Sequence, residues 1–147
     1  MMVVRGLVAA LLLSAGAAAA ERAPQVNYLL RCQGCHLADG SGLPKAGIPD
    51  FVGQVGIFAG LPEGRQYLLH VPGVIGSSLS DKEIADVLNY IMETYSGPSL
   101  PDNYQPFTAE EVMDLRAMDI GNVVKYRRLV AEKLAALGIA APDYPWP

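Results

Sequence analysis

The stretch Cys32-Gln33-Gly34-Cys35-His36 has the pattern C-x-x-C-H and determines what the rest of the chain folds around. Two thiols at this spacing can add to the two vinyl groups of one haem, and the histidine beside them can then bind the iron. C-x-x-C alone would leave a redox-active dithiol open. The following histidine, an export signal and the absence of a βαβ pattern around the motif favour one covalent haem c, held by Cys32 and Cys35 with His36 on the iron.

Residues 1–20 have the features of an export signal. Arg5 supplies a positive start, residues 6–20 are apolar and uncharged, and the alanines at 18–20 satisfy the small-residue rule for cleavage. The apolar run is shorter than the about 20 residues that a spanning helix needs. We therefore expect cleavage after Ala20, a periplasmic or otherwise exported protein, and no integral membrane span in the mature chain. The alternative is an uncleaved anchor.

Composition limits the classes of partner. The mature chain has 127 residues, which suits one domain, and its ten basic residues are outnumbered by 15 acidic ones. Phosphate binding requires a basic face, so a nucleic-acid partner is not expected. The chain contains two cysteines, and both belong to the C-x-x-C-H motif. They cannot join distant parts of the fold.

Helical periodicity and capping signals predict an all-α fold. A short helix leads into the motif, with Val26, Leu29 and Leu30 on one face. Ser80 and Glu83 form a capping box for the clearest helix. Glycine and proline make residues 37–60 a loop. The helices predicted in residues 21–97, the expected haem domain, are Pro24–Arg31, Pro62–His70 and Ser80–Tyr95.

Residues 98–147 are predicted to be a C-terminal extension of two helices packed on the haem domain. The first helix opens with a second capping box, Thr108 with Glu111, and the second runs from about Asn122 to Leu137, with Gly138 as its C-cap. Helices this short are marginal alone in water, so their apolar stripes should be buried. A basic cluster on the last helix is interpreted either as its solvated face or as a docking patch. The cluster contains Lys125, Arg127 and Arg128.

Between Val26 and Tyr95 the sequence resembles the class I monohaem cytochromes c. The C-x-x-C-H motif is followed by Leu37-Ala38-Asp39-Gly40-Ser41-Gly42, which is similar to the family's CH-x-x-D-G-x-G. The segment Ile48-Pro49-Asp50-Phe51-Val52-Gly53 resembles its P-x-L-x-G segment. Residues 79–91, LSDKEIADVLNYI, resemble its last core helix. The resemblance implies a few helices around one haem, with the first and last core helices crossing near the attachment site.

The same resemblance implies roles for single residues. The carbonyl of Pro49 would accept a hydrogen bond from Nδ1 of His36, as metal-bound histidines usually require. The alternative role for Pro49 is a turn. Phe51, Tyr67 and Leu68 would form walls of the haem pocket, which for apolar side chains is close to ordinary core packing.

The chain departs from the family in the loop that usually supplies a methionine to the iron. That loop, residues 71–78 (VPGVIGSS), contains no methionine, whereas His70 lies directly before it. His70 is therefore a candidate second ligand by exclusion. The alternatives are Met92 or a later methionine, and an open or water-bound site. A histidine in place of methionine would lower the reduction potential.

These observations predict an electron carrier rather than an enzyme. One haem would accept single electrons from a periplasmic redox protein and pass them on, with a dehydrogenase or an oxidase as the kinds of partner expected. One alternative is a haem protein with an open iron that binds a small ligand. The other is a haem subunit of a larger periplasmic dehydrogenase, which the long C-terminal extension suggests.

Overall fold

The computed structural model describes residues 21–144, so the predicted signal at residues 1–20 lies outside the described part. Its secondary structure is helical, with an isolated bridge between Leu43 and Ile48 and no strand in this part of the chain. The predicted all-α class is confirmed. The helices are α1 (Pro24–Arg31), α2 (Gln33–His36), η1 (Pro44–Ala46), α3 (Gly56–Ala59), α4 (Pro62–His70), α5 (Pro72–Ile75), α6 (Asp81–Tyr95), η2 (Gly97–Ser99), α7 (Ala109–Arg116) and α8 (Val123–Ala136).

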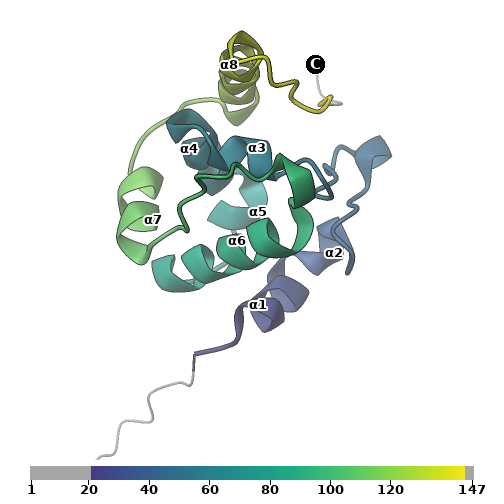
Figure 1. The fold of residues 1–147 in the computed structure, drawn as a ribbon. Helices are drawn as coiled ribbons and strands as arrows, with labels where there is room; N and C mark the ends of the chain where they lie inside the picture. Colours follow the sequence, from purple (N-terminus) through teal and green to yellow (C-terminus); the bar gives the residue numbers. More distant parts are fainter. Residues whose placement is uncertain (1–20, 145–147) are drawn as a thin grey trace, which may run out of the picture.

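The longest helix, α6, organises the fold. It packs against α1 on one side and α7 on another, while α4 packs against α3, α7 and α8 (Figure 1). The predicted capping box begins α6: Ser80 Oγ accepts from the backbone N–H of Glu83, and the Glu83 carboxylate accepts from the N–H of Ser80 at 3.0 Å. The start of this helix therefore follows from local sequence.

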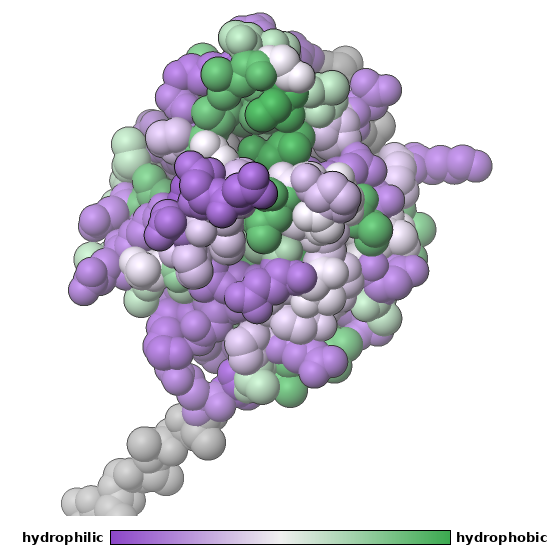
Figure 2. Space-filling model, in the orientation of Figure 1, coloured by the Kyte–Doolittle hydropathy of each residue, from purple (hydrophilic) through white to green (hydrophobic). Residues whose placement is uncertain are grey.

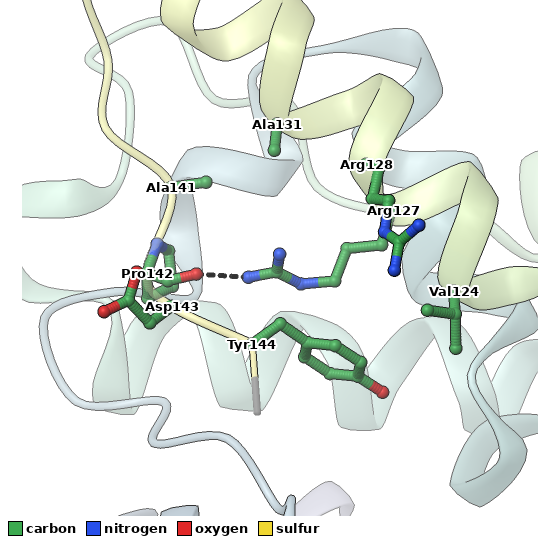
Figure 3. A pocket seen from close by; sticks show the side chains of 8 residues that line it. All are labelled: Val124, Arg127, Arg128, Ala131, Ala141, Pro142, Asp143 and Tyr144. Carbon is green, nitrogen blue, oxygen red and sulfur yellow. Dashed lines mark hydrogen bonds between the residues drawn. The ribbon is translucent and has the colours of Figure 1, made fainter. Parts of the chain in front are cut away.

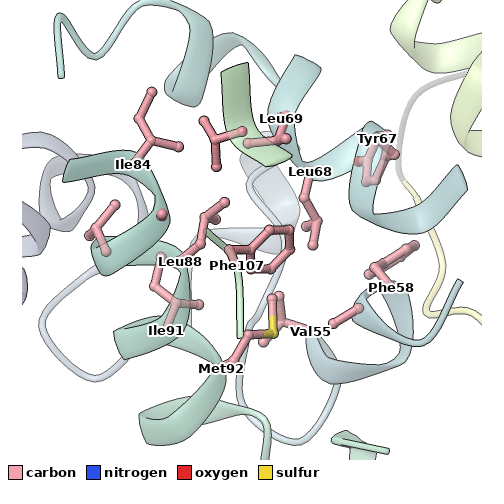
Figure 4. Packing of buried hydrophobic residues seen from close by; sticks show 14 of the residues in the cluster. Val55, Phe58, Tyr67, Leu68, Leu69, Ile84, Leu88, Ile91, Met92 and Phe107 are labelled. Atoms are coloured by element: carbon pink, nitrogen blue, oxygen red, sulfur yellow. The ribbon is translucent and has the colours of Figure 1, made fainter. Parts of the chain in front are cut away.

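One core joins α6 to α3, α4 and the extension (Figure 4). The buried positions of α6 recur at helical spacing, as its sequence pattern predicts. The extension contributes four fully or almost fully buried side chains to the same core: Phe107, Val112, Val130 and Leu134. Residues of the extension are thus part of the core that the helices of residues 21–97 share.

Arg65 links α4 to the extension. Its guanidinium contacts both carboxylate oxygens of Glu111 at 2.5 Å and donates to the Gln105 carbonyl at 2.9 Å. The charged group lies 3.8 Å from the centre of the Phe107 ring. A bidentate arginine–carboxylate pair over an aromatic ring is a specific and comparatively strong contact. Arg65 therefore fixes the start of α7 against α4.

This contact changes the predicted cap of α7. Thr108 Oγ1 accepts from the Glu111 N–H at 3.2 Å, which is one half of a capping box. The Glu111 carboxylate, which would complete the box, pairs with Arg65 instead. Arg65, which lies 46 positions earlier in the sequence, thus takes the place of the local partner of the Glu111 carboxylate.

Helix α1 buries a different face from the one that its apolar residues suggest. Val26, Leu29 and Leu30 are exposed, whereas Asn27 and Tyr28 are buried toward the core.

A second group of exposed apolar residues lies in the C-terminal extension. Figure 2 shows apolar side chains gathered over α8 on an otherwise largely polar face. The exposed apolar residues of α8 and the segment after it are Leu129, Leu137 and Ile139.

We predict that Arg65→Met lowers the free energy of unfolding by about 2–3 kcal/mol, because it leaves Glu111 and the Gln105 carbonyl without their shared partner. The Arg65 side chain is only 12% exposed. Lys133→Met is the control: it removes an extension–α4 pair to Glu63 whose lysine is 47% exposed, and it should cost no more than about 1 kcal/mol. Urea unfolding of both variants measures the difference. Equal losses would contradict the assigned role of Arg65.

Candidate metal centre

The C-x-x-C-H segment forms the end of α1 and the single turn α2. Cys32 follows α1 directly, and its backbone N–H donates to the Tyr28 carbonyl at 2.8 Å. Both thiols are free, Cys32 half-buried against the core and Cys35 exposed. Burial, with a smaller contribution from Cys35, raises the pKa of the Cys32 thiol to about 11. The two sulfurs thus face different surroundings, one apolar and one open to solvent.

His36 is oriented through one of its ring nitrogens. Nδ1 lies 3.2 Å from the carbonyl oxygen of Pro49, and the ring stacks on Phe51 with centroids 3.9 Å apart and planes 15° apart. Burial lowers the pKa of His36, and the Pro49 carbonyl opposes this effect. Among residues 21–144, Nε2 has no hydrogen-bond partner. A neutral ring that donates through Nδ1 presents its Nε2 lone pair to a metal.

Two tyrosine hydroxyls hold the chain that follows His36. Tyr28 of α1 donates to the Leu37 carbonyl at 2.7 Å, and Tyr95 of α6 donates to the Ala38 carbonyl at 3.0 Å. These bonds connect the motif to both helices that cross beside it. Neither tyrosine is among the site residues that the sequence predicted. The sequence signal that could have identified Tyr28 is its position one helical turn before Cys32.

Glycines allow the loop after His36 to pass close to its supports. Gly40 lies beneath the Tyr95 ring, where a Cβ atom would come within 2.7 Å of the ring carbon Cδ1. Gly42 has φ +62°, and a Cβ atom there would lie 2.3 Å from the Pro49 carbonyl oxygen. A side chain at position 42 would therefore displace the group that contacts Nδ1 of His36.

The three candidate wall residues occupy different places, and one of them, Leu68, is buried in the core. Phe51 is half-buried and stacks on His36. Tyr67 is buried in the core beside Phe58, with ring centroids 5.3 Å apart. Burial raises the pKa of Tyr67 to about 12, and the Arg127 guanidinium opposes this shift.

His70 uses both ring nitrogens in contacts with backbone carbonyls. Nδ1 lies 2.8 Å from the Gln66 oxygen, and Nε2 lies 2.8 Å from the Met118 oxygen. A neutral imidazole donates through only one nitrogen, so both contacts are hydrogen bonds only when the ring is protonated. In this arrangement His70 has no free nitrogen, and the predicted ligation to iron would require the ring to leave both carbonyls. His70 instead connects α4 to the segment after α7.

The methionines after residue 20 lie on α6 or in the extension. Met92 is buried in the core, where its side chain points into the cluster near Val55 and Phe107 (Figure 4), and its sulfur lies 3.5 Å from Ser96 Oγ. Met113 and Met118 are 55% and 50% exposed. Residues 71–78 form the short helix α5 and a turn, where the sequence predicted a loop.

Comparison with curated proteins gives two similar sequences, both named cytochrome c-552 and both from Thermus thermophilus. One is 36% identical over an alignment of 131 positions that covers 77% of this chain and 86% of the relative. The chain belongs to the c-type cytochromes. The other is 36% identical over an alignment of 105 positions that covers 59% of this chain and 79% of that protein. No protein-family profile matches the chain.

Membership of this family indicates which cofactor the chain carries and what that cofactor does. A c-type cytochrome carries covalently bound haem c, whose iron exchanges electrons, so this chain is an electron-transfer protein that works with redox partners. The donor set near α2 fits such a group: two free thiols lie beside an imidazole whose Nδ1 is already engaged. In the part of the chain that the structure describes, no helix is long and apolar enough to cross a membrane.

We predict that Gly42→Ala destabilises this c-type cytochrome by about 2 kcal/mol or more, because it combines a strained backbone with a clash against Pro49. Gly53→Ala is the matched control: Gly53 has φ +68° with nothing within 4 Å of an added Cβ, so it isolates the backbone term of about 1 kcal/mol. Thermal unfolding of the two variants tests this. If they lose equal stability, the close approach of Gly42 to Pro49 is unimportant.

Proposed function

We propose that this c-type cytochrome is a class I monohaem protein in which Cys32 and Cys35 form the two thioether bonds and His36 binds the iron. The free Nε2 of His36, opposite an engaged Nδ1, is the observation that carries this assignment. Each thiol would add its S–H across one vinyl group of the haem, so that a carbon–sulfur bond would form and the thiol hydrogen would go to the neighbouring vinyl carbon. No external oxidant or reductant is needed for this step.

The surrounding residues are proposed to position the ligand. The Pro49 carbonyl holds the Nδ1 proton of His36, and Phe51 keeps the imidazole from turning by stacking on it. A hydrogen bond to the second nitrogen fixes the tautomer of a ligating histidine and tunes its basicity. Tyr67 is proposed as a pocket wall on the strength of the family resemblance and its burial in the core.

We propose that the protein is an exported electron carrier rather than an enzyme. Covalently bound haem supplies a one-electron couple, and the polypeptide holds it and controls access to it. Cys35 is exposed, so the attachment site lies at the surface, where a redox protein can approach. The apolar segment before Glu21 supports a periplasmic location, with a dehydrogenase or an oxidase as donor or acceptor.

A second candidate function follows from the contacts of His70. Both of its nitrogens face carbonyls, Met92 is buried beside Ser96, and residues 71–78 contain neither histidine nor methionine. This arrangement favours an iron that would take water or a small external ligand in addition to His36. Such a site would allow ligand binding in addition to, or instead of, simple electron transfer.

The attachment assignment predicts that the haem remains with the denatured protein during acid–acetone extraction. Cys35→Ala should retain haem through Cys32 alone, and its pyridine haemochrome band should move to longer wavelength because one vinyl group remains unsaturated. Cys32→Ala should give the same shift, and the double variant should release haem into the organic phase. Free haem extracted from the unaltered protein would contradict the proposal.

The contacts of His70 predict that His70→Ala leaves the ferric and ferrous spectra unchanged and lowers the free energy of unfolding by about 1–2 kcal/mol, because the ring no longer joins the Gln66 and Met118 carbonyls. Met92→Leu is the companion variant, since it removes the buried sulfur with little change in volume. Conversion to a high-spin spectrum in either variant would identify that residue as an iron ligand. Unchanged spectra in both, with CO binding to the reduced protein, would support an open site.

A further inference from the structure

A pocket of about 240 Å³ lies between α8 and the chain at residues 141–144 (Figure 3). Arg127 and Arg128 reach it from α8, and Pro142, Asp143 and Tyr144 close it from the other side. The pocket therefore contains two arginines and one carboxylate. It lies in the C-terminal extension, away from the C-x-x-C-H segment in the sequence.

Arg127 is the unusual residue of this pocket. It is only 8% exposed, so it does not belong to a solvent-facing basic patch with Lys125 and Arg128, which are both exposed. Its Nη2 donates to the Pro142 carbonyl, and its guanidinium lies 4.7 Å from the Tyr144 ring centre and 5.8 Å from that of Phe58. Among the described residues, no carboxylate forms an ion pair with it.

The contrast with Arg65 shows what Arg127 lacks. Arg65 is similarly enclosed, but it has a bidentate carboxylate partner as well as carbonyl contacts. A guanidinium has five N–H donors in a planar fork, and one carbonyl occupies one of them. Burying a cation without a counter-charge is unfavourable. Asp143 lines the pocket, yet Figure 3 shows its carboxylate beyond the Pro142 carbonyl, turned away from the guanidinium.

From these contacts we propose that the pocket is a binding site for a single carboxylate group, with Arg127 as its main ligand and Arg128 at its rim. The planar fork of Arg127 matches the two oxygens of a carboxylate. Two arginines and one aspartate give the pocket a net charge of about one positive unit, which suits a monoanion better than a phosphate dianion. The Tyr144 ring beside the guanidinium provides apolar surface for a short carbon chain.

The carboxylate can come from two sources. One is a propionate of the protein's own haem, a source that rests on the proposed function. Arg127 lies over Phe58, which contacts the proposed pocket wall Tyr67. The other source is a small free carboxylate from solution. Both would use the same donors, so the experiment must separate them.

Arg127→Gln in the full holoprotein tests the site, and Lys125→Gln is the matched control, since it removes the same charge from an exposed position of α8. Acetate is the probe for the free source, compared with chloride at equal ionic strength. If a free carboxylate binds, acetate should raise the unfolding midpoint of the unaltered protein and of Lys125→Gln but not of Arg127→Gln.

If the haem propionate is the occupant, acetate should have no specific effect. The reduction potential of Arg127→Gln should then fall further than that of Lys125→Gln, and the pH at which the potential changes should move upward because the carboxylate has lost its cation. Arg127→Leu, which removes the same charge and fills the buried position with an apolar side chain, replaces Arg127→Gln if the latter does not fold.

Two results together overturn the proposal. Acetate and chloride would have the same effect on the unfolding midpoint, and the variant at position 127 would change neither the reduction potential nor its pH dependence more than Lys125→Gln does. The acetate measurement reads the unfolding midpoint and not a property of the haem, so it distinguishes failure of this site from failure of the haem assignment. Acid–acetone extraction of the same samples reports on the latter independently.

Discussion

The imidazole of His36 has Nδ1 engaged and Nε2 without a partner among residues 21–144, and several residues of the surrounding chain contribute to this arrangement. The Pro49 carbonyl faces Nδ1, and Phe51 stacks on the ring. Gly42 leaves room for the carbonyl that Pro49 presents. Tyr95 adds a tether from the longest helix to the residues just after the histidine. The loop between α2 and α3 is therefore ordered by the geometry of a single side chain, although it contains little regular structure.

The C-terminal extension is an integral part of the fold, because it contributes residues to the common core. Phe107 and Val112 are buried in the common core, and the guanidinium of Arg65 lies over the Phe107 ring while it pairs with Glu111. Charged and apolar contacts thus meet at one place, where α4, α7 and the segment before α7 come together. Movement of the extension would uncover part of the haem-domain core.

Local signals in the sequence predicted most of the longer helices and the ligand motif, because capping and the C-x-x-C-H spacing depend on neighbouring residues. Ser80 with Glu83 is the clearest example. Contacts between distant residues could not be read in this way. The Glu111 carboxylate pairs with Arg65 rather than completing the cap of its own helix. His70 contacts the Met118 carbonyl, and Arg127 is buried although the basic residues near it in the sequence are exposed. The attachment roles of Cys32, Cys35 and His36 stay predictions from the motif, now with a defined geometry around the imidazole.

The position of the core residues along the chain has a consequence for maturation. The cysteine pair occurs early in the sequence, whereas Val130 and Leu134, which are fully buried, come almost last. Cys32 packs against the same core to which these two residues belong. A chain whose last helix has not yet packed therefore lacks two fully buried side chains of the core that supports the attachment segment. Covalent loading at Cys32 would be least hindered before α8 joins that core.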